Sequence, residues 1–134
     1  MRHLLSLGCL LVGACAQPAA PPVCSAPLKP AVEVDLYFGR DKDSGGEVSE
    51  AEWARFLAEV VTPRFPDGLS VLNVDGQARV PSSGRIVRER TKLLVVVVFD
   101  APAHQTRVGE VVEAYRRRFG QHGVFRTEHA VCAG

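Results

Sequence analysis

Hydrophobic and polar residues follow two different periods along the chain, and the two periods succeed one another in a regular order. Apolar and polar residues alternate over residues 32–38, which is the period of a half-buried β-strand. After a polar stretch with paired glycines, Ser49 and Glu52 form the capping box of a helix start. The next apolar residues recur three and four positions apart, as on one helical face: Trp53, Phe56, Leu57 and Val60. Pro63 ends this predicted helix.

The second half of the chain predicts three more strands and one more helix. Residues 69–74 predict a strand, and Asp75 with Gly76 is a turn signal after it. A third strand is predicted over residues 92–99, extending back toward Arg85. A second helix, closed by Gly120, has one apolar face: Val108, Val111, Val112, Tyr115 and Phe119. Residues 124–131 predict the last strand.

The order of elements is therefore β-α-β-β-α-β. That order, with a central hairpin, is the ferredoxin-like arrangement of the α+β class. It predicts an antiparallel four-stranded sheet with both helices on one face. In such a sheet the first and last strands are antiparallel neighbours, so the start of the first strand lies beside the end of the last.

The third predicted strand is apolar at every position over residues 93–99. A sheet covered by helices on one face only should alternate between apolar and polar residues. The unbroken run therefore predicts that both faces are covered. A second copy of the chain across the open face is the simplest cover, and a long loop or the N-terminal segment is the alternative.

The N-terminus has the pattern of an export signal. A short basic start precedes the apolar run of residues 4–12, which is too short to span a bilayer because a spanning helix needs about 20 apolar residues. The run ends in Val12-Gly13-Ala14-Cys15, which resembles the bacterial lipobox. Residues 1–14 are thus expected to be a lipoprotein signal peptide, with lipid on Cys15 as the membrane anchor. The alternative is an ordinary signal peptide in which Cys15 is incidental.

The anchor implies a place in the cell envelope. Residue 16 is Ala and not Asp, so in a host with two membranes the resemblance implies the periplasmic side of the outer membrane. Residues 15–30 are rich in proline and alanine, which excludes a helix or a central strand and predicts an extended tether. The folded domain is expected over residues 31–134.

Two further cysteines fall at the ends of the predicted domain. Cys24 precedes the first strand and Cys132 ends the last, and the predicted topology brings these ends together. Because exported proteins fold in an oxidising compartment, we predict a Cys24–Cys132 disulfide. Two free thiols, or a disulfide to a partner, are the alternatives.

The charge composition gives no support to one class of partner. The formal net charge of +1 comes from Arg2 in the leader, and the remaining 15 basic residues balance 15 acidic ones. This balance gives no electrostatic reason to expect a nucleic acid as partner.

Four blocks resemble a known family, the domain of unknown function 3574. The blocks are LYFGR at 36–40, GGEVSEAEW at 45–53, VTPRFPDGLSVL at 61–72 and GRIVRE at 84–89. The resemblance runs over about residues 32–132 and implies a small, often exported protein without an established activity. Cys132 is similar to the family's cysteine near the end of the last strand. Ala78 departs from the family, which often has an aromatic residue there, so a pocket lined by that aromatic would differ in this chain.

The candidate ligand-binding residues are polar and lie in predicted loops. Arginine side chains with carboxylates nearby can bind a small anion through two parallel hydrogen bonds. The candidates are Arg40, Arg64, Asp67, Gln77, Arg85 and Arg88. Ion pairs that stabilise the fold are the other interpretation of each.

The sequence contains no nucleophile elbow, no metal-ligand spacing among its histidines and no phosphate loop. It therefore predicts no catalytic residue, no metal and no cofactor.

Two functions remain. The first is an exported, membrane-anchored lipoprotein that binds a small ligand or a protein in the envelope. The second is a small enzyme of the ferredoxin-like or dimeric α/β-barrel type, with a pocket lined by loop Arg, Tyr and Gln. A closed cavity collecting Arg40, Arg64, Gln77 or Arg88 would favour the enzyme.

Overall fold

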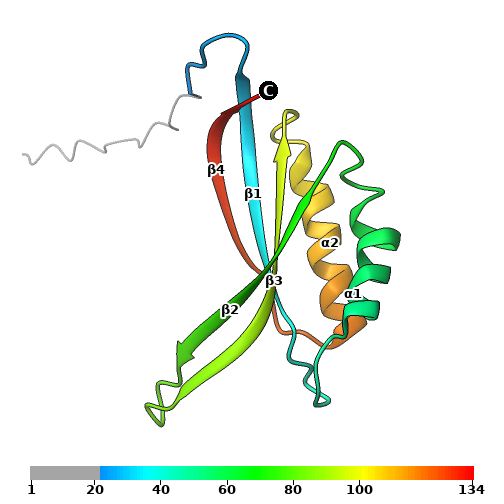
Figure 1. The fold of residues 1–134 in the computed structure, drawn as a ribbon, viewed down its shortest axis with the longest axis vertical. Helices are drawn as coiled ribbons and strands as arrows, with labels where there is room; N and C mark the ends of the chain where they lie inside the picture. Colours follow the sequence, from blue (N-terminus) through cyan, green and yellow to red (C-terminus); the bar gives the residue numbers. More distant parts are fainter. Residues whose placement is uncertain (1–21) are drawn as a thin grey trace, which may run out of the picture.

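The fold has two layers, a four-stranded antiparallel sheet and a pair of helices on one of its faces (Figure 1). The computed structural model describes residues 22–134. Its elements are β1 (Lys29–Gly39), α1 (Glu50–Phe56), η1 (Leu57–Val61), β2 (Ser70–Arg79), β3 (Ile86–Val98), α2 (His104–Phe119) and β4 (Phe125–Ala133). The sheet order is β2-β3-β1-β4, which confirms the ferredoxin-like α+β prediction. The predicted signal peptide, Cys15 and the first part of the tether lie outside the described residues.

The core lies between the sheet and the helices, and aromatic rings form its centre. Val34, Leu36 and Phe38 of β1 are fully buried, as the alternation over 32–38 predicts. The Phe38 ring lies 4.7 Å from that of Tyr115 on α2 and 5.3 Å from that of Trp53 on α1. The Tyr115 hydroxyl donates a hydrogen bond of 2.8 Å to the carbonyl oxygen of Gly39. Burial raises the pKa of that hydroxyl, although the Arg40 charge opposes the rise.

The first helix begins and ends where its sequence directs. Ser49 and Glu52 form the predicted capping box. The last turn widens to a π-helix, η1, in which the Thr62 amide donates to the Leu57 carbonyl five residues back, and Pro63 follows. The second helix ends at Gly120, whose positive φ of 64° suits glycine at this position.

Protonation of Glu52 is expected to weaken the capped helix. The hydrogen bond from Lys42, with those from Ser49, holds the Glu52 pKa at about 2, well below its usual 4.5. Because the folded pKa is the lower one, the stabilisation is present above pH 4.5 and is lost as the pH falls toward 2. Urea denaturation of wild type and Glu52→Gln should show the variant less stable at pH 7, with the difference closing near pH 2. A difference that persists at pH 2 would contradict this account.

The β2–β3 hairpin departs from the prediction at Asp75 and Gly76. These residues do not form a turn but continue β2, opposite Arg90 and Glu89 of β3. The turn lies further on, at residues 81–84, where Gly84 has a positive φ of 69°. The local turn signal did not decide the structure, because cross-strand pairing continues on both sides of these two residues. Any residue, glycine included, can adopt an extended backbone.

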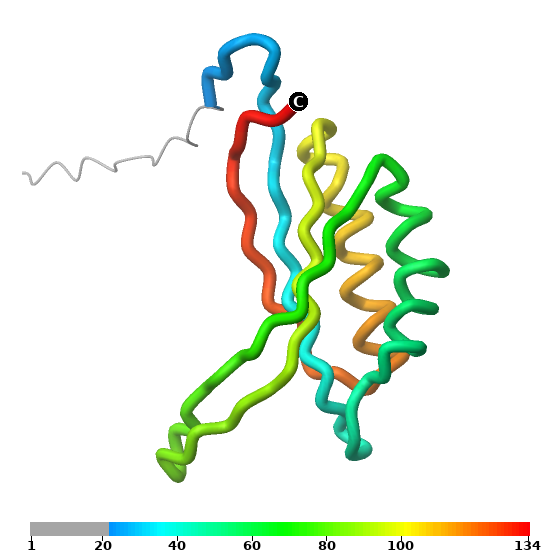
Figure 2. Tube along the Cα trace, viewed as in Figure 1, coloured from blue at the N-terminus to red at the C-terminus, as the bar shows by residue number. Residues whose placement is uncertain are grey.

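The hairpin extends past the rest of the sheet. β1 pairs with β3 from residue 91 to residue 98, whereas β2 pairs with β3 from residue 86 onward. Residues 76–89 therefore form a two-stranded projection, here called the hairpin arm. Figures 1 and 2 show it diverging from β1 and β4.

Strand β3 is apolar throughout its second half, yet its two faces differ. Leu94, Val96 and Val98 face the helices and are buried. Leu93 and Val95 on the other face are half-buried, and Val97 is 38% exposed. No helix of the described residues covers this open face, so the expected second copy across it stays a prediction.

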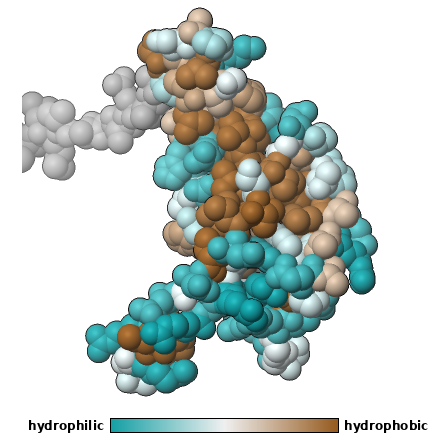
Figure 3. Space-filling view, viewed as in Figure 1, coloured by the Kyte–Doolittle hydropathy of each residue, from teal (hydrophilic) through white to brown (hydrophobic). Residues whose placement is uncertain are grey.

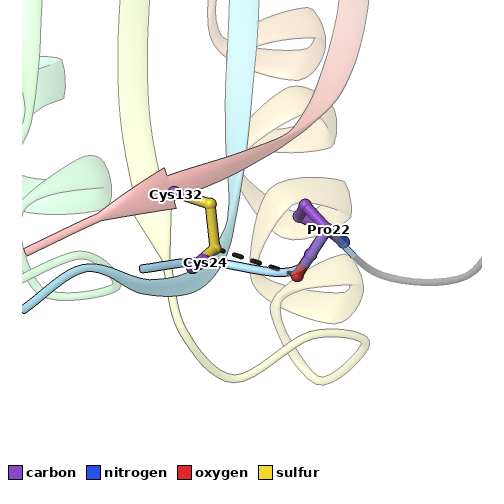
Figure 4. The surroundings of a disulfide bond; sticks show 3 residues. All are labelled: Pro22, Cys24 and Cys132. Carbon is purple, nitrogen blue, oxygen red and sulfur yellow. Dashed lines mark hydrogen bonds between the residues drawn. A yellow bond between two sulfur atoms is a disulfide. The ribbon is translucent and has the colours of Figure 1, made fainter. Parts of the chain in front are cut away.

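The predicted disulfide is confirmed. Cys24 and Cys132 are bonded, with their Cα atoms 5.6 Å apart (Figure 4). The pairing of β1 with β4 creates this proximity, because Pro30 lies directly opposite Cys132. Pro22 lies beside the bond, its carbonyl oxygen 3.8 Å from the Cys24 sulfur. The N-terminal segment is thus fixed covalently to the last strand.

Within residues 22–134, no helix is both long enough and apolar enough to cross a membrane.

Candidate functional site

Open clefts lie on the surface of residues 22–134, and a polar one lies where the hairpin arm leaves the sheet. This hairpin cleft has a volume of about 780 Å³. Strands β1, β2, β3 and β4 all contribute, together with the loops that follow β1 and α2. Its polar lining includes Asp41, Asp43, Gln77, Glu89, Gln121 and His122.

One wall of the hairpin cleft is aromatic. Tyr37 of β1 and Phe125 of β4 are directly paired across the two strands, and their ring centroids are 5.6 Å apart. Phe125 is 68% exposed, which is unusual for so large an apolar side chain. These rings offer a solvent-accessible apolar surface beside the polar loops.

The opposite side of the hairpin cleft is acidic. Glu89 lies against the backbone of Gly39, where a Cβ would collide with its carboxylate, and its Oε1 accepts the Asp41 amide at 3.3 Å. Asp43 pairs with the largely exposed His122 at 3.2 Å. None of the described residues that line this cleft is Lys or Arg. The cleft therefore suits a positively charged or amphipathic partner better than an anion.

A charged network lies behind the cleft, between β3 and the start of α1. Lys92 is 3% exposed, and its Nζ lies 2.6 Å from Glu50 Oε2 and 2.6 Å from Asn73 Oδ1. Glu50 also pairs with Arg40 at 2.9 Å. The hydrogen bond from Lys92 holds the Glu50 pKa below its usual value, against a smaller opposing effect of burial. The network compensates the buried charge of Lys92 and ties α1 to the sheet.

Arg40 belongs to this network and not to a ligand pocket. It is 8% exposed, and its Nε and one terminal nitrogen donate to the Val48 carbonyl at 2.9 and 2.7 Å. Together with the ion pair to Glu50, these bonds occupy the guanidinium group of Arg40, so this side chain stabilises the fold.

The second, terminal cleft lies at the other end of the sheet, beside the C-terminus, and has a volume of about 840 Å³. It contains two sequence candidates, Arg64 and Asp67. Arg64 already pairs with Glu110 of α2 at 2.8 Å and donates to the Val60 carbonyl at 2.9 Å. Arg107 pairs with Asp100 through two bonds and lies over the Phe65 ring. The cations of this cleft are engaged within the fold.

The remaining candidates lie on the hairpin arm. Gln77 is on β2 where the arm begins and also lines the hairpin cleft, whereas Arg85 and Arg88 lie on the arm and are exposed. The six sequence candidates are therefore distributed over the charged network, the two clefts and the arm, and the structure does not bring them into one pocket.

A polar cluster around one buried histidine was not predicted from the sequence. His104, the first residue of α2, is 1% exposed, and its Nε2 lies 3.2 Å from Glu128 Oε1. Burial raises the Glu128 pKa, but hydrogen bonds from Arg126, His104 and Gln105 outweigh it and lower the net value. The signal in the sequence that could have indicated this cluster was the presence of charged residues at positions of β4 that face the helices.

Among residues 22–134 no three His, Cys, Asp or Glu side chains are grouped to hold a metal ion. The hairpin cleft combines an aromatic pair with exposed hydrophilic loops.

The fold and its clefts define a small, disulfide-linked α+β domain of the ferredoxin-like class. Residues 33–134 match the family described as protein of unknown function DUF3574, and the chain belongs to this family. Among proteins with curated functions, none matches the chain.

Two solved structures are similar in fold. A phage SAM lyase in complex with S-methyl-5'-thioadenosine superposes with a TM-score of 0.59 at 12% identity, covering 75% of this chain and 81% of that chain. A phage SAM lyase in the apo state gives a TM-score of 0.56 at 10% identity, covering 81% and 87%. At such identities the likeness concerns the fold alone.

Proposed function

We propose that this chain is an exported lipoprotein, anchored through lipid on Cys15, whose domain is a binding module of the bacterial cell envelope. The observation that carries the proposal is the Cys24–Cys132 disulfide. Structural disulfides persist in oxidising compartments and are rare in the cytosol. The disulfide thus supports export independently of the leader sequence.

The position of the disulfide also suits a tethered domain. The tether enters at the end of the sheet where β1 begins and β4 ends. The hairpin cleft lies at the opposite end of β1, beside Tyr37 and Gly39. A domain held this way presents the end of the sheet that carries the acidic, aromatic cleft away from the membrane.

The distribution of the candidate arginines favours binding over catalysis. The enzyme hypothesis requires a closed cavity that collects Arg40, Arg64, Gln77 or Arg88. In the structure Arg40 is buried in ion pairs, Arg64 is bound to Glu110, and Arg88 is exposed on the arm. Both clefts are open to solvent, and neither is the closed cavity that the enzyme hypothesis requires.

Metabolic labelling tests the anchor. The full chain is produced in a bacterium grown with an alkyne-bearing fatty acid, and the purified protein is examined for label and for its N-terminus by intact mass. We expect label on wild type and on Cys9→Ala, a leader cysteine that serves as the matched control, and none on Cys15→Ser. An unlabelled wild type, or one cleaved elsewhere than before Cys15, would overturn the proposal.

A further inference from the structure

Among residues 22–134 the strands of the hairpin arm have no further strand beside them. Over residues 76–89 they pair with each other, and β1 pairs with β3 no further than residue 91. A two-stranded hairpin alone is at best marginally stable in water, and its outer edges carry unpaired backbone groups. In Figure 3 the tip of the arm stands apart from the body, and the surface is hollowed where the two meet. An arm of this length needs a surface to lie on.

The arm is basic, although the basic and acidic residues of the chain beyond Arg2 balance in total. Arg79, Arg85 and Arg88 are exposed and make no ion pair with any residue in the described range 22–134. Ile86 is 52% exposed and lies directly opposite Arg79 in the hairpin. Because Ile86 and Arg88 are two residues apart on one strand, they share a face with Arg79. One face of the arm is therefore both cationic and apolar.

The hairpin cleft has the opposite character. Asp41 and Glu89 have no cationic partner among the described residues, and Asp43 has only His122. Phe125, the exposed ring of the aromatic wall, stands beside these carboxylates, and Leu72, 47% exposed, lies on the same face of the sheet. The cleft thus combines unpaired negative charge with apolar surface, the complement of the arm.

The arm of a molecule does not reach its own cleft. The cleft lies at the base of the arm, while the tip, with Arg85, lies several paired positions away along a continuous ladder. Folding back would break that ladder. The arm can instead reach the cleft of a second copy. A two-fold axis between the copies places each arm in the other copy's cleft, so every contact is made twice.

We propose that two copies of this chain interlock reciprocally through the hairpin arm and the hairpin cleft. Arg79 and Arg88 of each copy face Asp41 and Asp43 of the other, and Ile86 packs on the other copy's Phe125. This assembly uses the end of the open sheet face, not its centre over Val97. The proposed dimer does not depend on lipid at Cys15, so an unlabelled wild type would not contradict it.

Charge reversal on one side and then the other tests the interlock. The arm variant is Arg79→Glu with Arg88→Glu, and the cleft variant is Asp41→Lys with Asp43→Lys. Each alone should weaken dimerisation of the detergent-purified full chain by roughly tenfold or more, because like charges then meet in both contacts. Mixing the two variants should restore a heterodimer, since both of its contacts are again complementary. Native mass spectrometry separates the species, and circular dichroism verifies folding.

The matched control carries the same change of charge elsewhere. Arg55→Glu with Arg117→Glu, on the exposed sides of the helices, should dimerise like wild type. A monomeric wild type, homodimers of both variants, or a mixture without heterodimer would each overturn the proposal. Loss of the dimer in Val97→Lys but not in the arm variant would also overturn it, because that result places the contact at the centre of the open face.

Discussion

Replacing Cys24 and Cys132 together by alanine should lower the free energy of unfolding by about 2–5 kcal/mol. The bond joins residues 108 positions apart, so it removes a large part of the unfolded chain's freedom. Cys132 is exposed and Cys24 is half-buried, so little packing is lost with the sulfurs. The change in stability therefore reports mainly the cross-link.

Equilibrium urea denaturation measures this effect. The wild type with and without reductant should differ by the same amount as wild type and the double alanine variant, and reductant should leave the variant unchanged. A double variant as stable as the oxidised wild type would show that the bond contributes nothing.

The second large effect is expected at Phe38. Truncation of this fully buried ring to alanine removes contacts with Trp53, Phe56 and Tyr115 and should cost about 3–5 kcal/mol. Phe125→Ala is the matched control, since the same truncation at a ring that is 68% exposed should cost less than about 1 kcal/mol. Urea denaturation of both variants makes the comparison, and equal losses would contradict the assignment of the core.

The fold was predictable because each element repeats its signal several times. The alternation over residues 32–38 and the helical spacing from Trp53 to Val60 each identify a buried face, and the structure buries those faces together. The order of elements then fixed which strands are neighbours. The Cys24–Cys132 disulfide followed from that order, without any local signal.

The projecting arm was less predictable. Asp75 and Gly76 have the composition of a turn, but pairing with Arg90 and Glu89 continues through them. A strand that extends past its neighbours is decided by register across the sheet. Alternation within one strand does not contain that information.

The candidate ligand-binding residues lie in different parts of the structure for a related reason. Residue type alone does not separate an arginine that binds a ligand from one that stabilises a helix start. Arg40 and Arg88 look alike in sequence, yet one is 8% exposed among carboxylates and the other is free on the arm. Tyr37 and Phe125 were recoverable, because the predicted pairing of the first and last strands places the two rings side by side.

The disulfide also determines how the domain bears mechanical load. A pull on the N-terminal segment reaches Cys24 and is divided there between β1 and, through Cys132, β4. Both strands are then loaded along their length and in parallel, so the hydrogen bonds between them are not opened one after another from the terminus. Without the bond, the same pull would peel β1 out of the sheet from its first residue. Under the proposed anchoring, a pull through the N-terminal segment would therefore leave the cleft at the far end of the sheet intact.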